Sequence, residues 1–372
     1  MPRTVTLAAT QMDAAPAPTA ERLTRAETLA RQAAAAGAEL VVLPELFNLG
    51  YTYADVFDRA EPPDGPTASW MRRTAADLGV HLAGTLLLLD HQAVYNSLLL
   101  FAPDGRVWRY DKGYPWGWER RAFAPGPRAP VVARTDLGRI GLLICWDAAH
   151  LGLWRSYTGQ VDLMLISACP PDVSNPTYRL AGGATLGLED LGPAMARVKD
   201  SGRQLFGPMV NQQTAWLGVP AVQSVGCGQV RTVVPHGGLA LLGLLPQAPG
   251  LRRHAHRFGR IELSCALVRG CKIVDQHGAT LSELEQADGE SWTSASVTIA
   301  DAPPEPSGAQ PPSLLPREAY LSSDVLLPRM MRGVYRRGLR RRLGLRRPPG
   351  VRIGAALGAA LLAAYAWRRR GR

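Results

Sequence analysis

The pattern of apolar and polar positions predicts alternating strands and helices through the first half of the chain. Residues 5–11 have the composition of a strand, and residues 19–36 follow as a helix that Gly37 ends. One face of this helix is apolar and carries Leu23, Ala26, Ala30 and Ala33. Residues 40–43 form a short, continuous apolar run, which is typical of a strand buried on both faces of a sheet.

The same alternation continues along the chain. The pattern predicts a helix over residues 67–78, paired strands over residues 80–89 and 95–101, and buried strands over residues 140–145 and 161–167. A loop with helices near residues 186–198 follows, and then a strand–turn–strand pattern over residues 261–301. Alternating apolar strands and helices indicate an α/β layered fold rather than a helical bundle or an all-β sandwich.

Composition divides the chain into three parts. We expect a domain over residues 1–301, a linker rich in Pro and Ser over residues 302–324, and an arginine-rich tail over residues 325–372. The tail holds 14 Arg and no acidic residue, so the net charge of +11 leaves 11 − 14 = −3 for the rest. A nearly neutral body argues against nucleic-acid binding, and the tail becomes the candidate for contact with anionic partners.

Within the tail, residues 353–367 form an uncharged apolar stretch of 15 residues between arginines. A helix of that length is about 22 Å long, which is shorter than the roughly 30 Å hydrocarbon core of a bilayer. Three interpretations remain open: a membrane anchor, a helix packed on a neighbouring subunit, and a disordered basic tail.

Cysteine usage and the N-terminus favour a cytoplasmic protein, membrane-associated only if the tail acts as an anchor. The five cysteines lack any CxxC pair, so we expect neither a disulfide framework nor a zinc site. The first residues enter a strand-like run with no signal-peptide pattern. A reducing compartment would keep a catalytic thiol free.

Three residues in separate segments carry candidate chemistry. Glu45 follows residues 40–43, Lys112 lies in Tyr110-Asp111-Lys112, and Cys145 ends residues 140–145. Each alone is compatible with an ordinary role: a surface carboxylate, a solvated lysine and a small buried strand residue. Together, a carboxylate, an amine and a thiol at strand ends are what acyl transfer through a thioester requires.

The segments around these residues form recurrent motifs. They are Leu43-Pro44-Glu45-Leu46, Tyr110-Asp111-Lys112 and Gly141-Leu142-Leu143-Ile144-Cys145-Trp146-Asp147. A further glutamate, Glu119, precedes Phe123-Ala124-Pro125-Gly126. With these motifs in this order, the chain resembles the nitrilase superfamily of carbon–nitrogen hydrolases over about residues 3–301.

This resemblance implies a four-layer α-β-β-α sandwich that assembles into dimers or larger oligomers. It also implies that Cys145 attacks the carbonyl or nitrile carbon and that Glu45 accepts the thiol proton and later activates water. Lys112 would donate to the developing oxyanion, with the Trp146 backbone N–H as a second donor. Glu119 would support Lys112, and no metal or organic cofactor is expected.

The substrate branch depends on one residue. Asp147 follows Cys-Trp where nitrile-cleaving members usually carry Glu, so the resemblance favours amidases and carbamoylases. The substrate would be a small amide, carbamoyl compound or, as the alternative, a nitrile. Acyl transfer to an amine, and a catalytically silent scaffold of the same fold that binds membranes or partners, are the other interpretations.

The chain also departs from the family pattern after the nucleophile. Residues 148–152 and 219–225 do not match the usual elements, and residues 229–260 have the character of an enlarged insertion. Tyr51, Tyr114, Asp147 and His150 are the candidates for the substrate pocket, although His150 fits an ordinary core or surface histidine as well.

Overall fold

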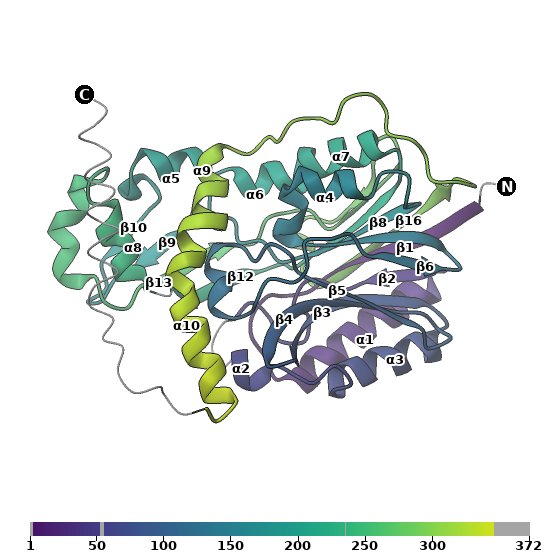
Figure 1. Cartoon of the computed structure of the whole chain (residues 1–372), viewed down its shortest axis with the longest axis horizontal. Helices are drawn as coiled ribbons and strands as arrows, with labels where there is room; N and C mark the ends of the chain where they lie inside the picture. The colour runs from purple at the N-terminus through teal and green to yellow at the C-terminus, as the bar shows by residue number, and fades with distance from the viewer. Residues whose placement is uncertain (1–2, 53–55, 235, 346–372) are drawn as a thin grey trace.

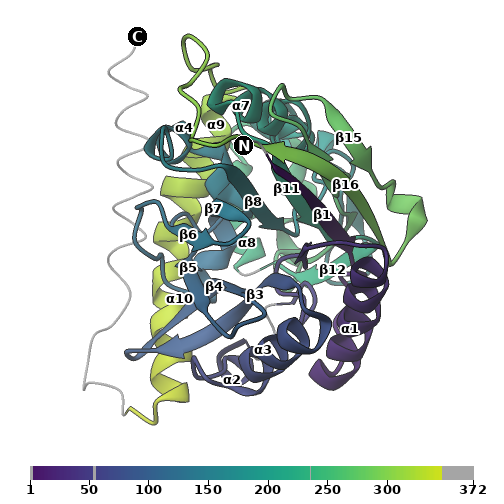
Figure 2. The ribbon, with the colours of Figure 1, turned by 90° about the vertical axis from the view of Figure 1, so that its right-hand side faces the viewer.

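Two six-stranded sheets form the centre of the molecule (Figures 1 and 2). The computed structural model describes residues 3–52, 56–234 and 236–345. The first sheet runs β16 (Ser291–Ile299), β1 (Arg3–Gln11), β2 (Leu40–Val42), β3 (His81–Asp90), β4 (Ala93–Phe101), β5 (Val107–Asp111). The second runs β15 (Thr280–Glu283), β14 (Lys272–Val274), β11 (Ala221–Val225), β8 (Leu163–Ala168), β7 (Gly138–Ile144), β6 (Val132–Thr135).

Helices cover the outer face of each sheet, as Figure 2 shows. α1 (Thr19–Ala35) and α3 (Pro66–Leu78) lie on the first sheet, and α4 (Leu151–Ser156) and α7 (Val210–Leu217) lie on the second. The buried face of α1 carries Ala26, Leu29, Ala30 and Ala33. The predicted four-layer α-β-β-α sandwich is therefore confirmed.

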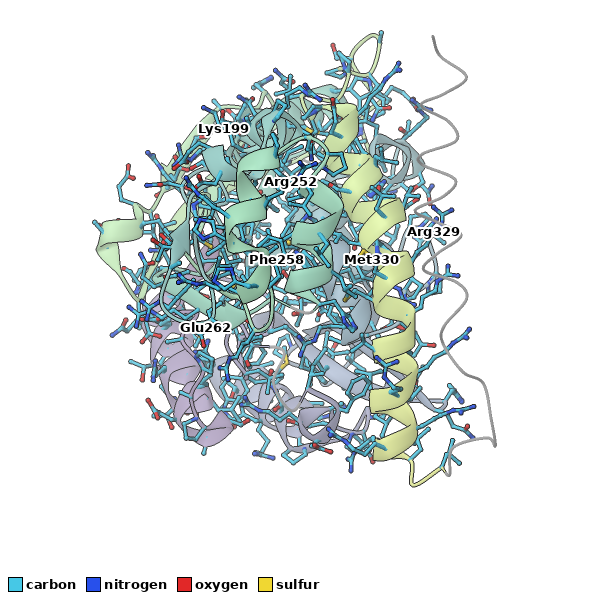
Figure 3. The ribbon with its side chains drawn as sticks, turned by 90° about the vertical axis from the view of Figure 1, so that its left-hand side faces the viewer. Lys199, Arg252, Phe258, Glu262, Arg329 and Met330 are labelled. Carbon is cyan, nitrogen blue, oxygen red and sulfur yellow. The ribbon has the colours of Figure 1, made fainter. Side chains whose placement is uncertain are left out.

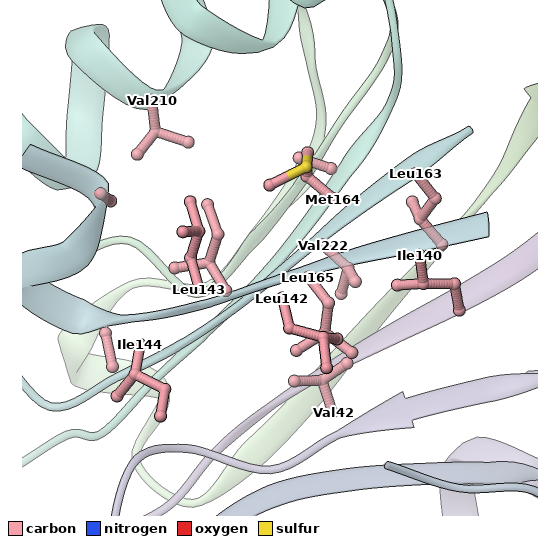
Figure 4. Packing of buried hydrophobic residues seen from close by; sticks show 14 of the residues in the cluster. Val42, Ile140, Leu142, Leu143, Ile144, Leu163, Met164, Leu165, Val210 and Val222 are labelled. Carbon is pink, nitrogen blue, oxygen red and sulfur yellow. The ribbon is translucent and has the colours of Figure 1, made fainter. Parts of the chain in front are cut away.

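The inner strands are buried on both faces, which explains their continuous apolar sequences. Leu142 of β7 and Leu165 of β8 point toward Val42 of the facing sheet (Figure 4). Leu143 points the other way, toward Val210 of α7. Since successive side chains of a strand alternate in direction, β7 fills the space between the sheets and the space under α7 at once.

A third, four-stranded sheet lies outside the sandwich. Its order is β10 (Thr185–Leu186), β9 (Thr177–Arg179), β13 (Glu262–Ala266), β12 (Gln229–Val233). The segment expected to be an insertion, residues 229–260, supplies β12, α8 (Gly237–Leu244) and the 3-10 helix η5 (Pro249–Arg257). Figure 3 shows this part of the molecule, with Phe258 and Glu262 labelled.

The C-terminal part of the described chain returns to the sandwich. Residues 302–316 form neither helix nor strand, and the indole N–H of Trp216 donates to the Gly308 carbonyl at 3.2 Å. Three consecutive helical segments follow: α9 (Arg317–Tyr320), the π-helical η7 (Leu321–Leu326) and α10 (Leu327–Arg342). They form one rod along the outside of the molecule, with Arg329 and Met330 on it (Figures 1 and 3).

This helical rod begins at residue 317, inside the segment that composition marked as a linker. The part of that segment without a helix therefore ends at residue 316. The division into domain, linker and tail stays a prediction. The apolar stretch 353–367 lies outside the described residues. Among the helices that the structure describes, none is long and apolar enough to cross a membrane.

Candidate active site

The three candidate residues lie just beyond the ends of strands in both sheets. Glu45 follows β2, Lys112 follows β5, and Cys145 follows β7 and begins the 3-10 turn η2 (Cys145–Ala149). All three are almost completely buried, with exposed fractions of 4%, 0% and 6%. The parallel strands β7 and β8 place their carboxyl ends at one edge, where α/β proteins collect reacting groups.

Lys112 lies between two carboxylates. Its Nζ donates to Glu45 Oε1 at 2.8 Å and to Glu119 Oε2 at 2.7 Å. The backbone N–H of Trp116 also donates to Glu119 Oε2, at 2.7 Å. Glu119 comes from the 3-10 turn η1 (Gly117–Arg121), so this turn fixes the second carboxylate against the lysine. The structure thus brings Glu45, Lys112 and Glu119 into one buried cluster.

Burial and charge shift the ionisation of the cluster. Burial opposes the Lys112 ammonium, but the neighbouring Cys145, Glu119 and Glu45 outweigh it and hold the lysine pKa well above its usual value. Burial raises the pKa of Glu119 to about 7 despite the nearby Lys112 cation. The pKa of the Cys145 thiol is raised well above its usual value by burial and by Glu45, while Lys112 opposes that rise. Cys145 is therefore held as a thiol, which would need a base to become reactive.

Cys145 itself has a left-handed backbone, with φ of 49°. For a non-glycine residue this conformation is energetically unfavourable, so it persists only when the surrounding structure fixes it. Such residues cluster at active sites. Here the strand ends and the turn begins at this residue. Cys145 is therefore held at a sharp corner between the strand and the turn.

Glu45 is oriented by two donors that the sequence did not single out. Asn96 Nδ2 donates to Glu45 Oε1 at 2.7 Å, and the Cys169 backbone N–H donates to Glu45 Oε2 at 3.0 Å. Asn96 is fully buried within β4. An amide inside an otherwise apolar strand was the available signal, because buried polar groups need partners.

A buried arginine holds the loop that follows Glu45. Arg22 of α1 donates from Nε to the Phe47 carbonyl at 2.6 Å and from Nη1 to the Asp13 and Ala15 carbonyls at 2.8 and 2.9 Å. Desolvation lowers the pKa of Arg22. Its position on the apolar face of the predicted helix was the signal that sequence reasoning missed.

Asp147 is occupied by internal contacts. It is fully buried, and it accepts from the Tyr110 hydroxyl at 2.9 Å and from the Tyr114 backbone N–H at 2.7 Å. Burial raises its pKa to about 6. Through these contacts Asp147 links the turn after Cys145 to the segment around Lys112. Its role in the substrate pocket stays a prediction.

The other pocket candidates are arranged around the turn. The rings of Tyr114 and His150 are stacked with centroids 3.4 Å apart, and the His150 ring meets Trp146 edge-on at 6.2 Å. Tyr51 is buried at the end of the loop after Glu45 and donates its backbone N–H to the Ala14 carbonyl at 2.7 Å. Tyr114, Trp146 and His150 therefore form one aromatic group beside Cys145, while Tyr51 lies on the Glu45 side.

Comparisons with known proteins agree with this geometry. Residues 6–181 match the carbon–nitrogen hydrolase family. Over these residues, just under half of the chain, the sequence has the pattern of the nitrilase superfamily. Among solved structures, a CN-hydrolase superfamily protein from Xanthomonas campestris with an arsenic adduct in its active site has a TM-score of 0.56 at 20% identity, covering 80% of this chain and 91% of that one. An amidase of Nesterenkonia sp. AN1 in complex with acrylamide gives the same TM-score, identity and coverage. At this identity the likeness establishes the nitrilase-superfamily fold.

Curated relatives are similar over shorter stretches. A nitrilase of Pyrococcus abyssi is 34% identical over 127 residues, which are 33% of this chain and 48% of that protein. An N-carbamoylputrescine amidase of Arabidopsis thaliana is 35% identical over 133 residues, 33% of this chain and 44% of that protein. The chain thus spans about half the length of the curated relatives that it matches.

Proposed function

We propose that this chain hydrolyses a non-peptide carbon–nitrogen bond of a small amide or carbamoyl compound through a thioester on Cys145. The observation that carries the proposal is the buried contact of Lys112 with both Glu45 and Glu119, beside a cysteine held at a strained strand end. A base, a cation and a thiol in one water-poor cluster suit nucleophilic acyl transfer.

The first half-reaction forms the thioester. Glu45 accepts the thiol proton as the Cys145 sulfur attacks the carbonyl carbon. Lys112 has three N–H donors, two of which contact carboxylates, so the third is available to the oxyanion. The Trp146 backbone N–H would be the second donor. Collapse of the intermediate expels the amine or ammonia, which takes the proton held by Glu45.

The second half-reaction releases the acid. Glu45 takes a proton from water, the resulting hydroxide attacks the thioester carbon, and the same donors stabilise the oxyanion. The Cys145 sulfur leaves and recovers its proton from Glu45. Glu119 keeps Lys112 in place throughout, because its Oε2 accepts a hydrogen bond from the ammonium at 2.7 Å.

Two features support the amide branch over the nitrile branch. Asp147 occupies the position after Cys-Trp, and the relatives include an N-carbamoylputrescine amidase and an ω-amidase of Danio rerio, which is 30% identical over 158 residues. A nitrilase is also among them, so nitrile hydrolysis is the second candidate.

The test measures ammonia release from aliphatic amides, N-carbamoyl amino acids and nitriles, with wild type and Cys145→Ala side by side. We expect release from the amide or carbamoyl compounds, reduced to background in the variant. Equal background from both proteins across all three classes would contradict hydrolysis. Lack of alkylation of Cys145 by iodoacetamide would then favour the silent scaffold.

The partner assignments are separate proposals. We propose a homodimer or larger oligomer, to be tested by sedimentation velocity, and a cytoplasmic location. We also propose that the tail contacts a membrane. The arginines of α10 support this contact, since they are exposed: Arg329, Arg332, Arg336, Arg337, Arg340, Arg341 and Arg342. Deletion of residues 325–372, which removes these arginines, should move the protein to the soluble fraction, and an unchanged membrane fraction would refute the anchor.

A further inference from the structure

The C-terminal rod, residues 317–342, contacts the turn that carries the nucleophile. The indole Nε1 of Trp146 donates to Asp324 Oδ1 at 2.9 Å, and His150 Nε2 lies 3.6 Å from Asp324 Oδ2. One helical turn earlier, the Tyr320 hydroxyl donates to the Ala149 carbonyl at 2.7 Å. The rod therefore contacts η2 at its second residue, at its last residue and at the histidine that follows.

The same rod contacts the turn that carries Glu119. Leu327 lies against Gly117, so closely that a Cβ on Gly117 would come within 2.8 Å of Leu327 Cδ1. Arg120 lies over the Tyr335 ring at 5.4 Å, and the Tyr335 hydroxyl accepts from the Val94 backbone N–H at 3.1 Å. One element thus contacts both 3-10 turns of the active site, from a position more than 130 residues after the segment that matches the family.

We propose that this rod is a brace for the two catalytic turns and that Asp324 is a positioning residue, which fixes Trp146 and through it the nucleophile and the oxyanion donor. The proposal rests on the proposed function. Asp324 does not touch the reacting atoms; it acts through the indole of Trp146, whose backbone N–H lies next to Cys145 in sequence.

The physical reason lies in the geometry of the turn. η2 has only five residues and begins at a residue with positive φ, so local hydrogen bonds alone define it weakly. A charge-assisted bond between the half-buried Asp324 carboxylate and the buried indole adds a fixed point outside the turn. A displacement of about 1 Å in a reacting group can cost about 100-fold in rate, so loss of this point should be visible in turnover.

The alternative is that Asp324 only helps the rod to pack. That role predicts a loss of stability without a specific loss of turnover. The two roles separate because Asn at this position keeps an oxygen that accepts from the indole, whereas Leu does not. Glu318 of α9 offers a matched control, because it pairs with Arg197 at 2.8 Å on the exposed surface and touches neither turn.

The experiment compares Asp324→Leu, Asp324→Asn and Glu318→Gln with wild type in the full chain. The readouts are kcat and KM on the best amide, and the rate at which iodoacetamide alkylates Cys145, followed by mass spectrometry of its peptide. For Asp324→Leu we expect kcat about 10- to 100-fold lower, KM within about threefold and clearly slower alkylation. Asp324→Asn should retain most of both rates, and Glu318→Gln should match wild type.

Trp146→Phe keeps the test decisive if Asp324→Leu folds poorly. It removes the indole donor and leaves the rod intact, so it should reproduce the loss, and the double variant should lose no more than either single variant. Wild-type alkylation and turnover in Asp324→Leu would overturn the proposal, and so would equal losses in Asp324→Asn and Asp324→Leu. If wild type hydrolyses no amide, the proposed function fails, while the alkylation rates still test the brace.

Discussion

The buried cluster of Glu45, Lys112 and Glu119 and the C-terminal rod that lies against it hold the same site in different ways. The cluster is fixed from two strand ends and the 3-10 turn η1 by ion pairs of 2.7–2.8 Å between groups with almost no exposure. The rod acts through half-buried contacts, and the Asp324 side chain is 21% exposed. Removing one member of a buried ion pair leaves an uncompensated charge, whereas removing a partly solvated contact lets water replace it.

This difference predicts an abrupt response in the cluster and a graded response in the rod. Lys112→Met should give the largest effect. It removes an oxyanion donor, which typically costs about 100- to 1,000-fold in kcat. It also leaves two buried carboxylates without their cation, so the free energy of unfolding should fall by about 3–5 kcal/mol. Steady-state kinetics and urea titration measure the two losses, and a stable, active variant would show that the cluster is not the centre of the site.

The second effect concerns the orientation of Glu45. Asn96→Leu removes one of the donors that hold the Glu45 carboxylate, and a hydrogen bond to a charged group is worth about 1.5–3 kcal/mol. We expect kcat to fall about 10- to 100-fold. Asn211→Leu on α7 is the control for loss of an amide that bonds a charged group elsewhere, since Asn211 bonds to Gly278 and to the buried Lys272 ammonium. Equal kcat values for the two variants would show that Asn96 has no specific role in catalysis.

The third effect is a change in pH dependence. The pKa of Glu119 is raised to about 7, so the carboxyl is neutral below that pH and, above it, its negative charge holds the Lys112 ammonium. We expect kcat/KM to rise between pH 6 and 8, and this rise to vanish in Glu119→Gln, with a loss of about tenfold at pH 8. If kcat/KM of Glu119→Gln still rises near pH 7, a group other than Glu119 is responsible for that ionisation.

The ionisation of Glu119 should affect stability in the opposite direction to activity: stability falls as the pH rises. Because the folded pKa lies above the usual 4.5, Glu119 contributes stability that is present below pH 4.5 and lost as the pH rises through 7. The Tm of wild type should therefore fall relative to Glu119→Gln between pH 5 and 8, which differential scanning calorimetry at several pH values measures.

The smallest catalytic effect should come from the far part of the rod. Tyr335→Phe removes the acceptor for the buried Val94 N–H and should lower the free energy of unfolding by about 1–3 kcal/mol. It leaves Asp324 and Trp146 untouched, so kcat should stay within about threefold. A large loss of kcat with unchanged stability would extend the positioning role to α10 as a whole.

Sequence patterns were most informative where local physics decides the structure. The continuous apolar runs gave buried strands because both faces of an inner strand are covered, and β1, β8 and the helix α3 begin and end within two residues of the expected bounds. Glu45 and Cys145 could be named because they follow or end such apolar runs, and the ends of strands gather at one edge of the fold. Lys112 follows the half-exposed strand β5 and was named through its motif.

The contacts of individual side chains followed the sequence less closely. The carboxylate of Asp147, a candidate for the pocket, is bonded to Tyr110 and to the Tyr114 backbone, and the sequence did not indicate these contacts. Asn96 and Arg22 passed unnoticed, because a buried polar residue in an apolar pattern reveals neither its partner nor its role. Their importance depends on which loop carbonyl or carboxylate lies within 3 Å.

The sequence by itself determined the layered α/β fold, the positions of the buried apolar strands along the chain and the three candidate reacting groups. Only the tertiary structure decided that one Lys112 ammonium bonds to both Glu45 and Glu119, and that the end of the segment assigned to a linker is helical and contacts the turn beginning at Cys145. The physical reason is range. Periodicity reports burial within one element, whereas Asp324 and Trp146 are 178 residues apart in the chain and meet only because two separate surfaces fit together.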